Sequence, residues 1–194
     1  MSKHICVLAL QGAFREHIIS VEALGASTVA VRLPEQLEGL DGLIIPGGES
    51  TAIGKLMATY RFYEPILHRH AEGMAVWGTC AGAILVASDV VDGLTDQRSL
   101  ELMDIEVRRN AYGRQAASFE ADLDFAHLSG GAFRGVFIRA PWIESVGEGV
   151  EVLAQHDGHI AAARQGRLMA TTFHPELTGD PRVHRFFLQD VVGT

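Results

Sequence analysis

One cysteine stands in a sequence pattern that is typical of a catalytic nucleophile. Cys80 is the central residue of Gly-Thr-Cys-Ala-Gly, residues 78–82, between a short apolar stretch and a segment rich in helix-forming residues. Flanking glycines permit a sharp strand-to-helix turn that lifts the side chain into a site, and free N–H groups at a helix start favour thiolate. The alternative is that Cys80 is a small buried apolar residue at a tight turn. Cys6, inside an apolar run without neighbouring glycines, is predicted to be a core residue.

A histidine and a glutamate two residues apart could activate that thiol. His174-Pro175-Glu176 follows the last apolar stretch of the chain. Because proline restricts the local backbone, we predict an extended segment in which residues 174 and 176 point the same way, so that Glu176 orients the His174 imidazole. The alternative is a surface histidine at the end of a strand. Other histidines lack such a context, and we expect solvated or exposed side chains at His68, His70, His127, His156, His159 and His184.

A glycine-rich loop, Gly47-Gly48, could complete such a site. Attack on an amide carbonyl creates an oxyanion, which the backbone N–H groups of Ala81 and Gly48 could stabilise. The rival interpretation of the loop is a phosphate-binding P-loop. It fails because five residues instead of four separate Gly48 from Gly54, the required Ser or Thr is missing, and Glu49 would repel phosphate. A turn with a purely structural role is the other alternative.

Alternating strand-like and helical stretches indicate how these segments are positioned. Strands are predicted in the first half at residues 5–10, 28–32, 42–45 and 74–77, and helices at residues 14–24, 50–59, 62–71 and 80–87. The second half is predicted to hold mainly strands, at residues 102–108, 118–123, 136–140, 150–155, 160–164 and 168–173, before a closing helix at residues 182–192. The strands at 150–155 and 160–164 are expected to form a hairpin around His156-Asp157-Gly158.

This order of elements predicts an α/β fold, a three-layer sandwich with a mainly parallel central sheet and antiparallel strands added late in the chain. Ligands of such sheets bind beyond the carboxyl ends of the strands. The segments at residues 46–51, 78–82 and 174–176 each follow a predicted strand. We therefore expect all three to lie at one edge of the sheet.

Length and composition narrow the class of protein. The chain has 194 residues, of which 47% are hydrophobic and 21% charged, so we expect a single domain over residues 1–194. A net charge of −8 without a basic cluster argues against a nucleic-acid partner. Apolar runs too short to span a bilayer predict a soluble, cytoplasmic protein. Two cysteines are too few for a disulfide framework, and the nine histidines lack the spacing of metal ligands. We therefore expect no metal site and no cofactor.

These residues together resemble the glutaminase subunits of pyridoxal 5′-phosphate synthase, a class I glutamine amidotransferase family. The resemblance runs over nearly the whole chain. The cysteine turn and His-Pro-Glu are typical of class I glutaminases in general. The segments that resemble this one family among the class I glutaminases are Arg109-Asn110, Tyr112-Gly113-Arg114-Gln115 and Phe137–Pro141.

The resemblance implies hydrolysis of L-glutamine to glutamate and ammonia, with Cys80 as nucleophile, His174 as general base and acid, and Glu176 as its partner. The residues that fall on the family's glutamine-binding positions are Gly48, Glu49, Ser50, Arg109, Ile138 and Arg139. It also implies a synthase subunit as partner, in a large hetero-oligomer that activates the glutaminase. Two alternatives stay open: an amidotransferase that feeds another acceptor, and a non-catalytic interaction or redox-sensing domain with the same fold.

Overall fold

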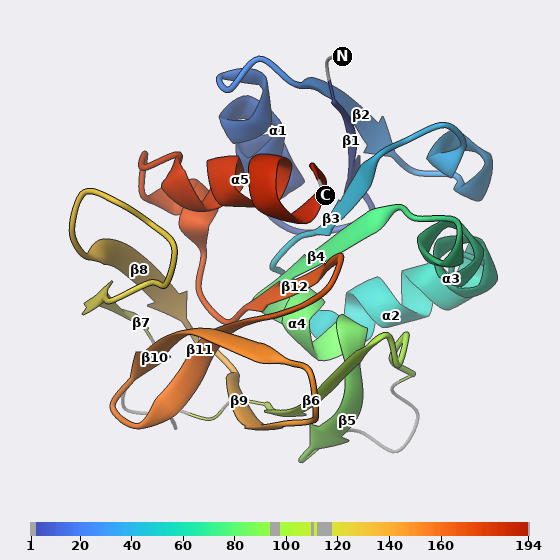
Figure 1. The fold of residues 1–194 in the computed structure, drawn as a ribbon. Coiled ribbons are helices and arrows are strands. Elements are labelled where there is room, and N and C mark those ends of the chain that lie inside the picture. Colours follow the sequence, from blue (N-terminus) through green and yellow to red (C-terminus); the bar gives the residue numbers. More distant parts are fainter. Residues whose placement is uncertain (1–2, 94–97, 110, 112–117, 194) are drawn as a thin grey trace.

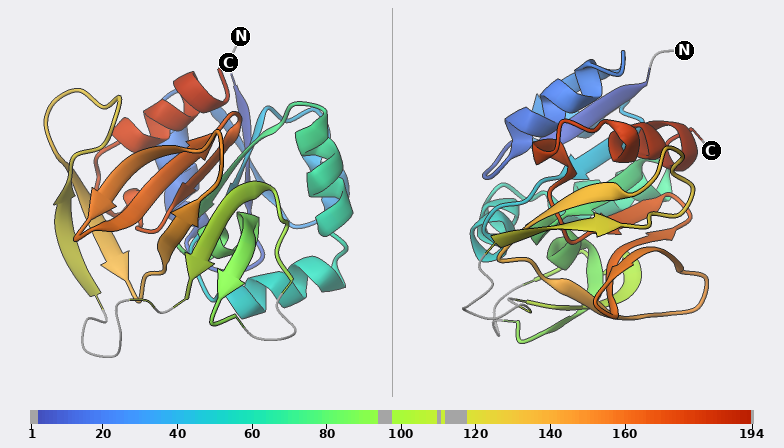
Figure 2. Two further views of the ribbon diagram at one scale, coloured as in Figure 1. Left: turned by 60° about the horizontal axis from the view of Figure 1, so that its bottom comes forward. Right: turned by 90° about the vertical axis from the view of Figure 1, so that its left-hand side faces the viewer.

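A computed structural model describes residues 3–93, 98–109, 111 and 118–193 of the chain. A central twisted sheet carries helices on both faces (Figures 1 and 2). The helices are α1 (Phe14–Glu22), α2 (Ser50–Thr59), α3 (Tyr63–Ala71), α4 (Ala81–Val86) and α5 (Arg182–Phe186), the last continuing as the π-helix η3 (Phe187–Val191). Two 3-10 turns are η1 (Pro34–Leu37) and η2 (Pro175–Leu177). None of the described helices combines the length and apolarity that a membrane crossing requires.

Within the described residues, ten strands form the main sheet and two form a separate hairpin. The strands are β1 (His4–Leu8), β2 (Ser27–Val31), β3 (Gly42–Ile45), β4 (Ala75–Thr79), β5 (Ala87–Val91), β6 (Met103–Arg108), β7 (Ser118–Leu123), β8 (Phe133–Ile138), β9 (Trp142–Val146), β10 (Glu151–His156), β11 (His159–Gln165) and β12 (Leu168–Thr171). The order across the main sheet is β2-β1-β3-β4-β12-β11-β9-β6-β5, and β10 pairs with β11. The antiparallel pair β7–β8 stands beside the main sheet (Figure 2).

The main sheet has a parallel half and a mostly antiparallel half. Neighbours from β2 through β1, β3 and β4 to β12 are all parallel. From β12 onward, β11, β9 and β6 pair antiparallel, and only the edge strand β5 is parallel to its neighbour. The predicted α/β sandwich, with a mainly parallel sheet and antiparallel strands added late in the chain, is confirmed.

Alternating side chains of the central strands build two apolar cores, one on each face of the sheet. Cys6 and Leu8 of β1 point into the core beneath α2, α3 and α4, whereas Ile5 and Val7 point into the core beneath α1 and α5. This period of two is that of a strand buried on both faces. The second core also receives Phe137 of β8, which joins the separate hairpin to the body of the molecule.

Several predicted elements need correction. The predicted helix at residues 80–87 ends at Val86, and the strand β5 that follows was not predicted because it is a short, half-exposed edge strand with little apolar pattern. Strand β9 was also missed.

The hairpin is confirmed, and Asp157 and Gly158 both have the positive φ of a type I′ turn. Its two flanking histidines, expected to be exposed, are half-buried: His159 stacks on Trp142 with ring centroids 3.7 Å apart.

Candidate active site

Three predicted motifs meet at the carboxyl edge of the parallel strands. β3, β4 and β12 are neighbours in the sheet, and the segments that follow them are those containing Gly47-Gly48, Cys80 and His174. They surround a cavity of about 520 Å³, a size suited to a small metabolite. The residues that line it are Gln11, Gly12, Ala13, Gly47, Gly48, Glu49, Ser50, Cys80, Ala81, Ile84, Arg109, Ile138, Arg139, Pro141, His174 and Leu177.

Cys80 sits in a strained turn between β4 and α4. Its φ is 49° and its ψ is −104°, a conformation that non-glycine residues rarely adopt and that is common at functional sites. The backbone N–H of Cys80 donates to the carbonyl of Thr171 at 2.8 Å. A Cβ at Gly78 would clash with the carbonyl of Gly82, and a Cβ at Gly82 would clash with that of Ile45. Both glycines are therefore needed for strand and helix to approach so closely.

His174 and Glu176 form a buried pair at the end of β12. The Nδ1 atom of His174 lies 2.7 Å from Oε1 of Glu176. Their side chains are 10% and 0% exposed, so solvent screens this contact little. The predicted contact is present, but the predicted extended backbone is wrong. Residues 175–177 form the 3-10 turn η2, with Pro175 at its first position, and this turn brings the carboxylate back beneath the imidazole.

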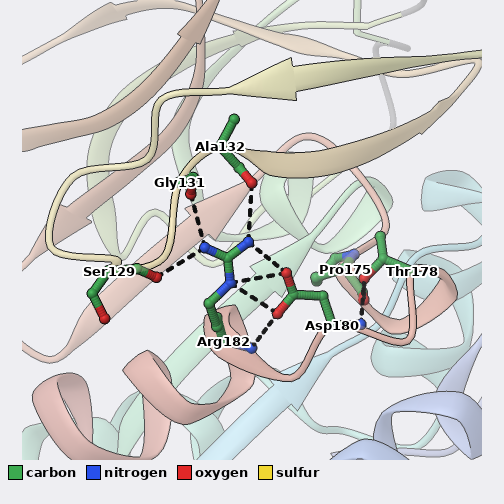
Figure 3. A network of polar contacts seen from close by, with 7 residues as sticks. All are labelled: Ser129, Gly131, Ala132, Pro175, Thr178, Asp180 and Arg182. Carbon is green, nitrogen blue, oxygen red and sulfur yellow. Dashed lines mark hydrogen bonds and ion pairs between the residues drawn. The ribbon is translucent and has the colours of Figure 1, made fainter.

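Arg182 anchors the segment that carries this pair. Figure 3 shows its guanidinium donating to the carbonyls of Ser129, Gly131 and Ala132 at 2.8–3.0 Å, in the loop between β7 and β8. The same group pairs with the Asp180 carboxylate at 2.7 Å. Partial burial would raise the pKa of Asp180, but the hydrogen bonds from Arg182 hold it below its usual value. The chain after Glu176 is thus tied to the β7–β8 hairpin.

Cys80 and His174 face each other across Gly47. A Cβ at Gly47 would clash with Cε1 of the His174 ring and lie 3.3 Å from Cβ of Cys80. Burial alone would lower the pKa of His174, but hydrogen bonds to Cys80 and Glu176 outweigh it and raise the pKa to about 10. The site therefore favours an imidazolium beside the cysteine. The Cys80 Sγ lies 4.0 Å from the carbonyl oxygen of Ile138, at the end of β8.

The glycine-rich loop is held by the segment after β1. The carbonyl of Gly47 accepts from the N–H of Ala13 at 3.0 Å, and Oε1 of Gln11 accepts from the N–H of Glu49 at 2.8 Å. Gln11 also lines the cavity, although it was not among the predicted site residues. Its place after a buried strand that neighbours β3 is the sequence signal that could have identified it, because the ends of adjacent parallel strands share one edge.

Glu49 and Arg109 lie together on one wall of the cavity. Glu49 caps α2 by accepting from the N–H groups of Thr51 and Ala52 at 3.0 and 2.7 Å. Slight burial would raise the pKa of Glu49, but these hydrogen bonds and Arg109 lower it below its ordinary value. The Arg109 guanidinium lies 3.7 Å from the Glu49 carboxylate. Ser50, the first residue of α2, is 4% exposed.

The remaining predicted binding residues come from the end of β8. Ile138 is 36% exposed and Arg139 has a φ of 43°, and both line the cavity. The structure thus brings every predicted substrate-binding residue to the cavity that contains Cys80. Asn110 and the motif at residues 112–115 lie outside the described residues.

Comparison with known proteins identifies the family. Residues 7–193 match the model of the SNO glutamine amidotransferase family. The chain belongs to this family. It is 58% identical to the pyridoxal 5′-phosphate synthase subunit PdxT of Herpetosiphon aurantiacus, and 55% identical to that of Roseiflexus castenholzii, each over 94% of this chain and 97% of the relative. The resemblance inferred from the sequence is confirmed.

A solved structure supports the same conclusion for the fold of this glutamine amidotransferase. It is described as the crystal structure of glutamine amidotransferase and is 49% identical to this chain. The TM-score is 0.91, over 98% of this chain and 99% of that one. More distant is the structure of PurLQS from Thermotoga maritima, which is 16% identical with a TM-score of 0.71 and is therefore alike in fold alone.

Two histidines of this glutamine amidotransferase lie buried behind the site. His184, predicted to be solvated, is 1% exposed, and His17 is 0% exposed. The prediction for His184 was wrong because α5 packs that face inward against Trp77, whose ring centroid is 5.1 Å from that of His184. Burial, together with the neighbouring His184 and His174, lowers the pKa of His17 well below its usual value. Burial likewise lowers the pKa of His184 to about 4.

These buried neutral imidazoles predict acid destabilisation. In the unfolded chain a histidine binds its proton near pH 6.5, whereas folded His184 resists protonation until about pH 4. The unfolded state therefore binds more protons between these values, and the stabilisation present above pH 6.5 is lost as pH falls. Urea unfolding at pH 7 and pH 5 should show His184 contributing about 2 kcal/mol to the difference. His184→Gln should reduce the dependence on pH, and a variant that keeps the full dependence would contradict this role of His184.

Proposed function

We propose that this protein hydrolyses glutamine with a Cys80–His174–Glu176 triad and passes the ammonia to a pyridoxal 5′-phosphate synthase subunit. The observation that carries the proposal is the meeting of Cys80 with the His174–Glu176 pair in one cavity, in a chain of the glutamine amidotransferase family. The relatives that are more than half identical to it are named as subunits of that synthase. We further propose that residues 1–194 act as a single glutamine amidotransferase domain.

In the proposed mechanism the Cys80 thiolate attacks the side-chain amide carbon of glutamine. A C–S bond forms, and the carbonyl π electrons move to oxygen. The His174 imidazolium then protonates the amide nitrogen, the C–N bond breaks, and ammonia leaves a thioester on Cys80. His174, now neutral, removes a proton from water as the water attacks the thioester. Glutamate is released and the thiolate is restored. Glu176, 2.7 Å from Nδ1, holds the imidazole in its tautomer and stabilises its positive form.

The oxyanion formed in both steps requires preorganised donors. The N–H of Ala81, in the first turn of α4, has no intrahelical acceptor and follows the nucleophile directly. The N–H of Gly48 is the second donor of the proposal, because this loop approaches Cys80 and His174 closely at Gly47. Each donor of this kind contributes roughly 3 kcal/mol to the stabilisation of the transition state.

The rest of the cavity would bind the amino-acid end of glutamine. Arg109 and Arg139 are the two arginines among the described residues that line it, and a guanidinium is suited to a planar carboxylate. Glu49 carries the carboxylate that complements an α-ammonium group. Ser50 is assigned to the site because it opens α2 beside this wall, and Ile138 because it supplies an apolar surface for the aliphatic part of the substrate.

The assignment predicts that the synthase subunit stimulates glutamate release. Glutamate formed from glutamine should be measured with and without the cognate synthase subunit, with Cys80→Ala as the blank. We expect the rate to rise by at least about 5-fold, the lower end of ordinary coupling between two sites, and to vanish in the variant.

Two other results of this assay would contradict parts of the proposal. Activity that does not depend on the synthase would retain the triad and remove the partner assignment. A chain that releases no glutamate under either condition would contradict the glutaminase itself and favour a non-catalytic domain.

A further inference from the structure

A row of buried polar groups continues behind Glu176, on the side away from His174. Oε2 of Glu176 lies 3.4 Å from Nε2 of His17, and both side chains are 0% exposed. His17 comes from α1, and Nδ1 of its ring lies 3.0 Å from Nε2 of His184 in α5. Nε2 of His17 is also 3.2 Å from Oγ1 of Thr79, the residue before Cys80. Segments far apart in the sequence thus place two imidazoles behind the proposed triad.

The protonation of these rings follows from their partners. His184 Nδ1 is buried without a hydrogen-bond partner among the described residues. A neutral imidazole carries one N–H, and burying an N–H without an acceptor costs more than burying a lone pair. The proton of His184 therefore belongs on Nε2, where it donates to Nδ1 of His17. That leaves the proton of His17 on Nε2, which faces Glu176 and Thr79.

The carboxylate of Glu176 supports the same assignment. Its Oε2 has no hydrogen bond of ordinary geometry within the described part of the chain, and Nε2 of His17 is a polar atom beside it. An N–H there meets the carboxylate favourably, whereas a lone pair would repel it. The groups that act electrostatically on His17 are His184 from α5, His174 from the end of β12 and Glu176 from η2. The His184 N–H therefore donates to His17, and the His17 N–H faces the carboxylate of Glu176.

We propose that His17 is a positioning residue for the glutaminase reaction. Its Nε2–H, fixed in that tautomer by His184, lies 3.2 Å from Oγ1 of Thr79 and faces Oε2 of Glu176 at 3.4 Å, as an electrostatic contact on the side opposite His174. Glu176 then has a hydrogen bond at Oε1 and a favourable polar neighbour at Oε2, so the imidazole that it orients keeps its other nitrogen toward Cys80. His17 does not line the cavity, and its proposed effect on His174 passes through Glu176. This inference rests on the proposed function of the triad.

The test compares two replacements of His17. His17→Met fills the space without a donor, and His17→Gln places an amide N–H near the position of Nε2. We expect His17→Met to lower kcat for glutamate release by about 10- to 100-fold, the usual effect of losing a group that orients a reacting residue. The KM for glutamine should stay unchanged, because no contact with the substrate is lost. His17→Gln should restore most of the kcat.

A packing control and a spectroscopic measurement separate positioning from stability. Val21→Ala, at a fully buried residue of the same helix, removes packing without removing a donor, and should lower the melting temperature but not kcat. Nitrogen-15 NMR of the intact protein with labelled histidines should show the protons of His17 and His184 on Nε2.

Several results would overturn the inference. They are a full kcat in His17→Met, a His17→Gln variant as impaired as His17→Met, a change confined to KM, or a His17 proton on Nδ1. A wild-type protein that releases no glutamate would instead remove the proposed function, and the positioning role with it. The two failures are therefore distinguishable.

Discussion

Replacement of Cys80 by alanine is expected to lower glutamate release by at least about 10³-fold, because a thioester requires a thiol and Cys6, the other cysteine of the sequence, lies in the core. The cavity itself should remain, since alanine fits the turn between β4 and α4. Cys6→Ala is the matched control. Its thiol is 0% exposed and donates to the carbonyl of Gly42 at 3.1 Å, and burial raises the pKa of Cys6 far above its usual range.

Two measurements check this prediction. Glutamate release should be followed by a coupled assay, and intact mass should be recorded after treatment with an electrophilic glutamine analogue. Wild type and Cys6→Ala should each gain one adduct and Cys80→Ala none. A Cys80→Ala variant that still hydrolyses glutamine at the wild-type rate would show that the nucleophile lies elsewhere.

Gly47→Ala is expected to lower kcat by about 10²-fold or more while the protein stays folded. The added methyl group would clash with Cε1 of His174, lie 3.0 Å from Nδ1 and lie 3.3 Å from Cβ of Cys80. The imidazole must then move, and a shift of about 1 Å in a reacting group can cost about 10²-fold in rate. The effect comes from crowding, since Gly47 does not have the positive φ that disfavours alanine.

Gly54→Ala provides the control for glycine replacement near the site. Its added methyl group would lie 3.5 Å from the Tyr63 hydroxyl and 3.6 Å from Cδ2 of Leu85, which are ordinary contacts. In the middle of α2 the change should stabilise the protein by about 0.5–1 kcal/mol and leave kcat unchanged. Steady-state kinetics and thermal melts of both variants are needed. Gly47→Ala with the wild-type kcat would mean that the His174 ring does not occupy the described position during the reaction.

The parallel half of the fold could be predicted because its strands are apolar runs separated by clear helix and turn signals. Helix α2 was predicted with the bounds that it has in the structure, and β3 likewise. Strand β5 was not, because an exposed edge strand carries too little apolar pattern to be distinguished from the helix before it. The pairing of β7 with β8 in a separate sheet could not be predicted either, because no local sequence pattern indicates the partner of each strand.

Parts of the candidate site that are encoded in short sequence motifs could be predicted. Contacts between elements that are distant in the sequence could not. Cys80, His174 and Glu176 were assigned to one candidate site from short motifs, and the structure places Cys80 and His174 on one cavity with Glu176 against His174. The contact between His174 and Glu176 was predicted for the wrong reason, because the turn at η2 replaces an extended segment. His17 gave no signal as a polar residue of the interior, since its burial is decided by α5, which follows it by more than 160 residues.

The place of β12 in the sheet governs when the site can assemble. This strand is among the last of the chain, yet it lies in the interior of the sheet, between β4 and β11. During synthesis the residues of the Cys80 turn emerge long before the residues from 168 onward. Until then β4 has an open edge, and the Cys80 N–H lacks the Thr171 carbonyl that it donates to in the folded protein. Contacts between such distant segments make folding slow, and open strand edges promote aggregation. A chain interrupted before residue 174 would therefore carry the Cys80 thiol without the proposed base. Insertion of β12 both closes the open edge of β4 and completes the proposed triad.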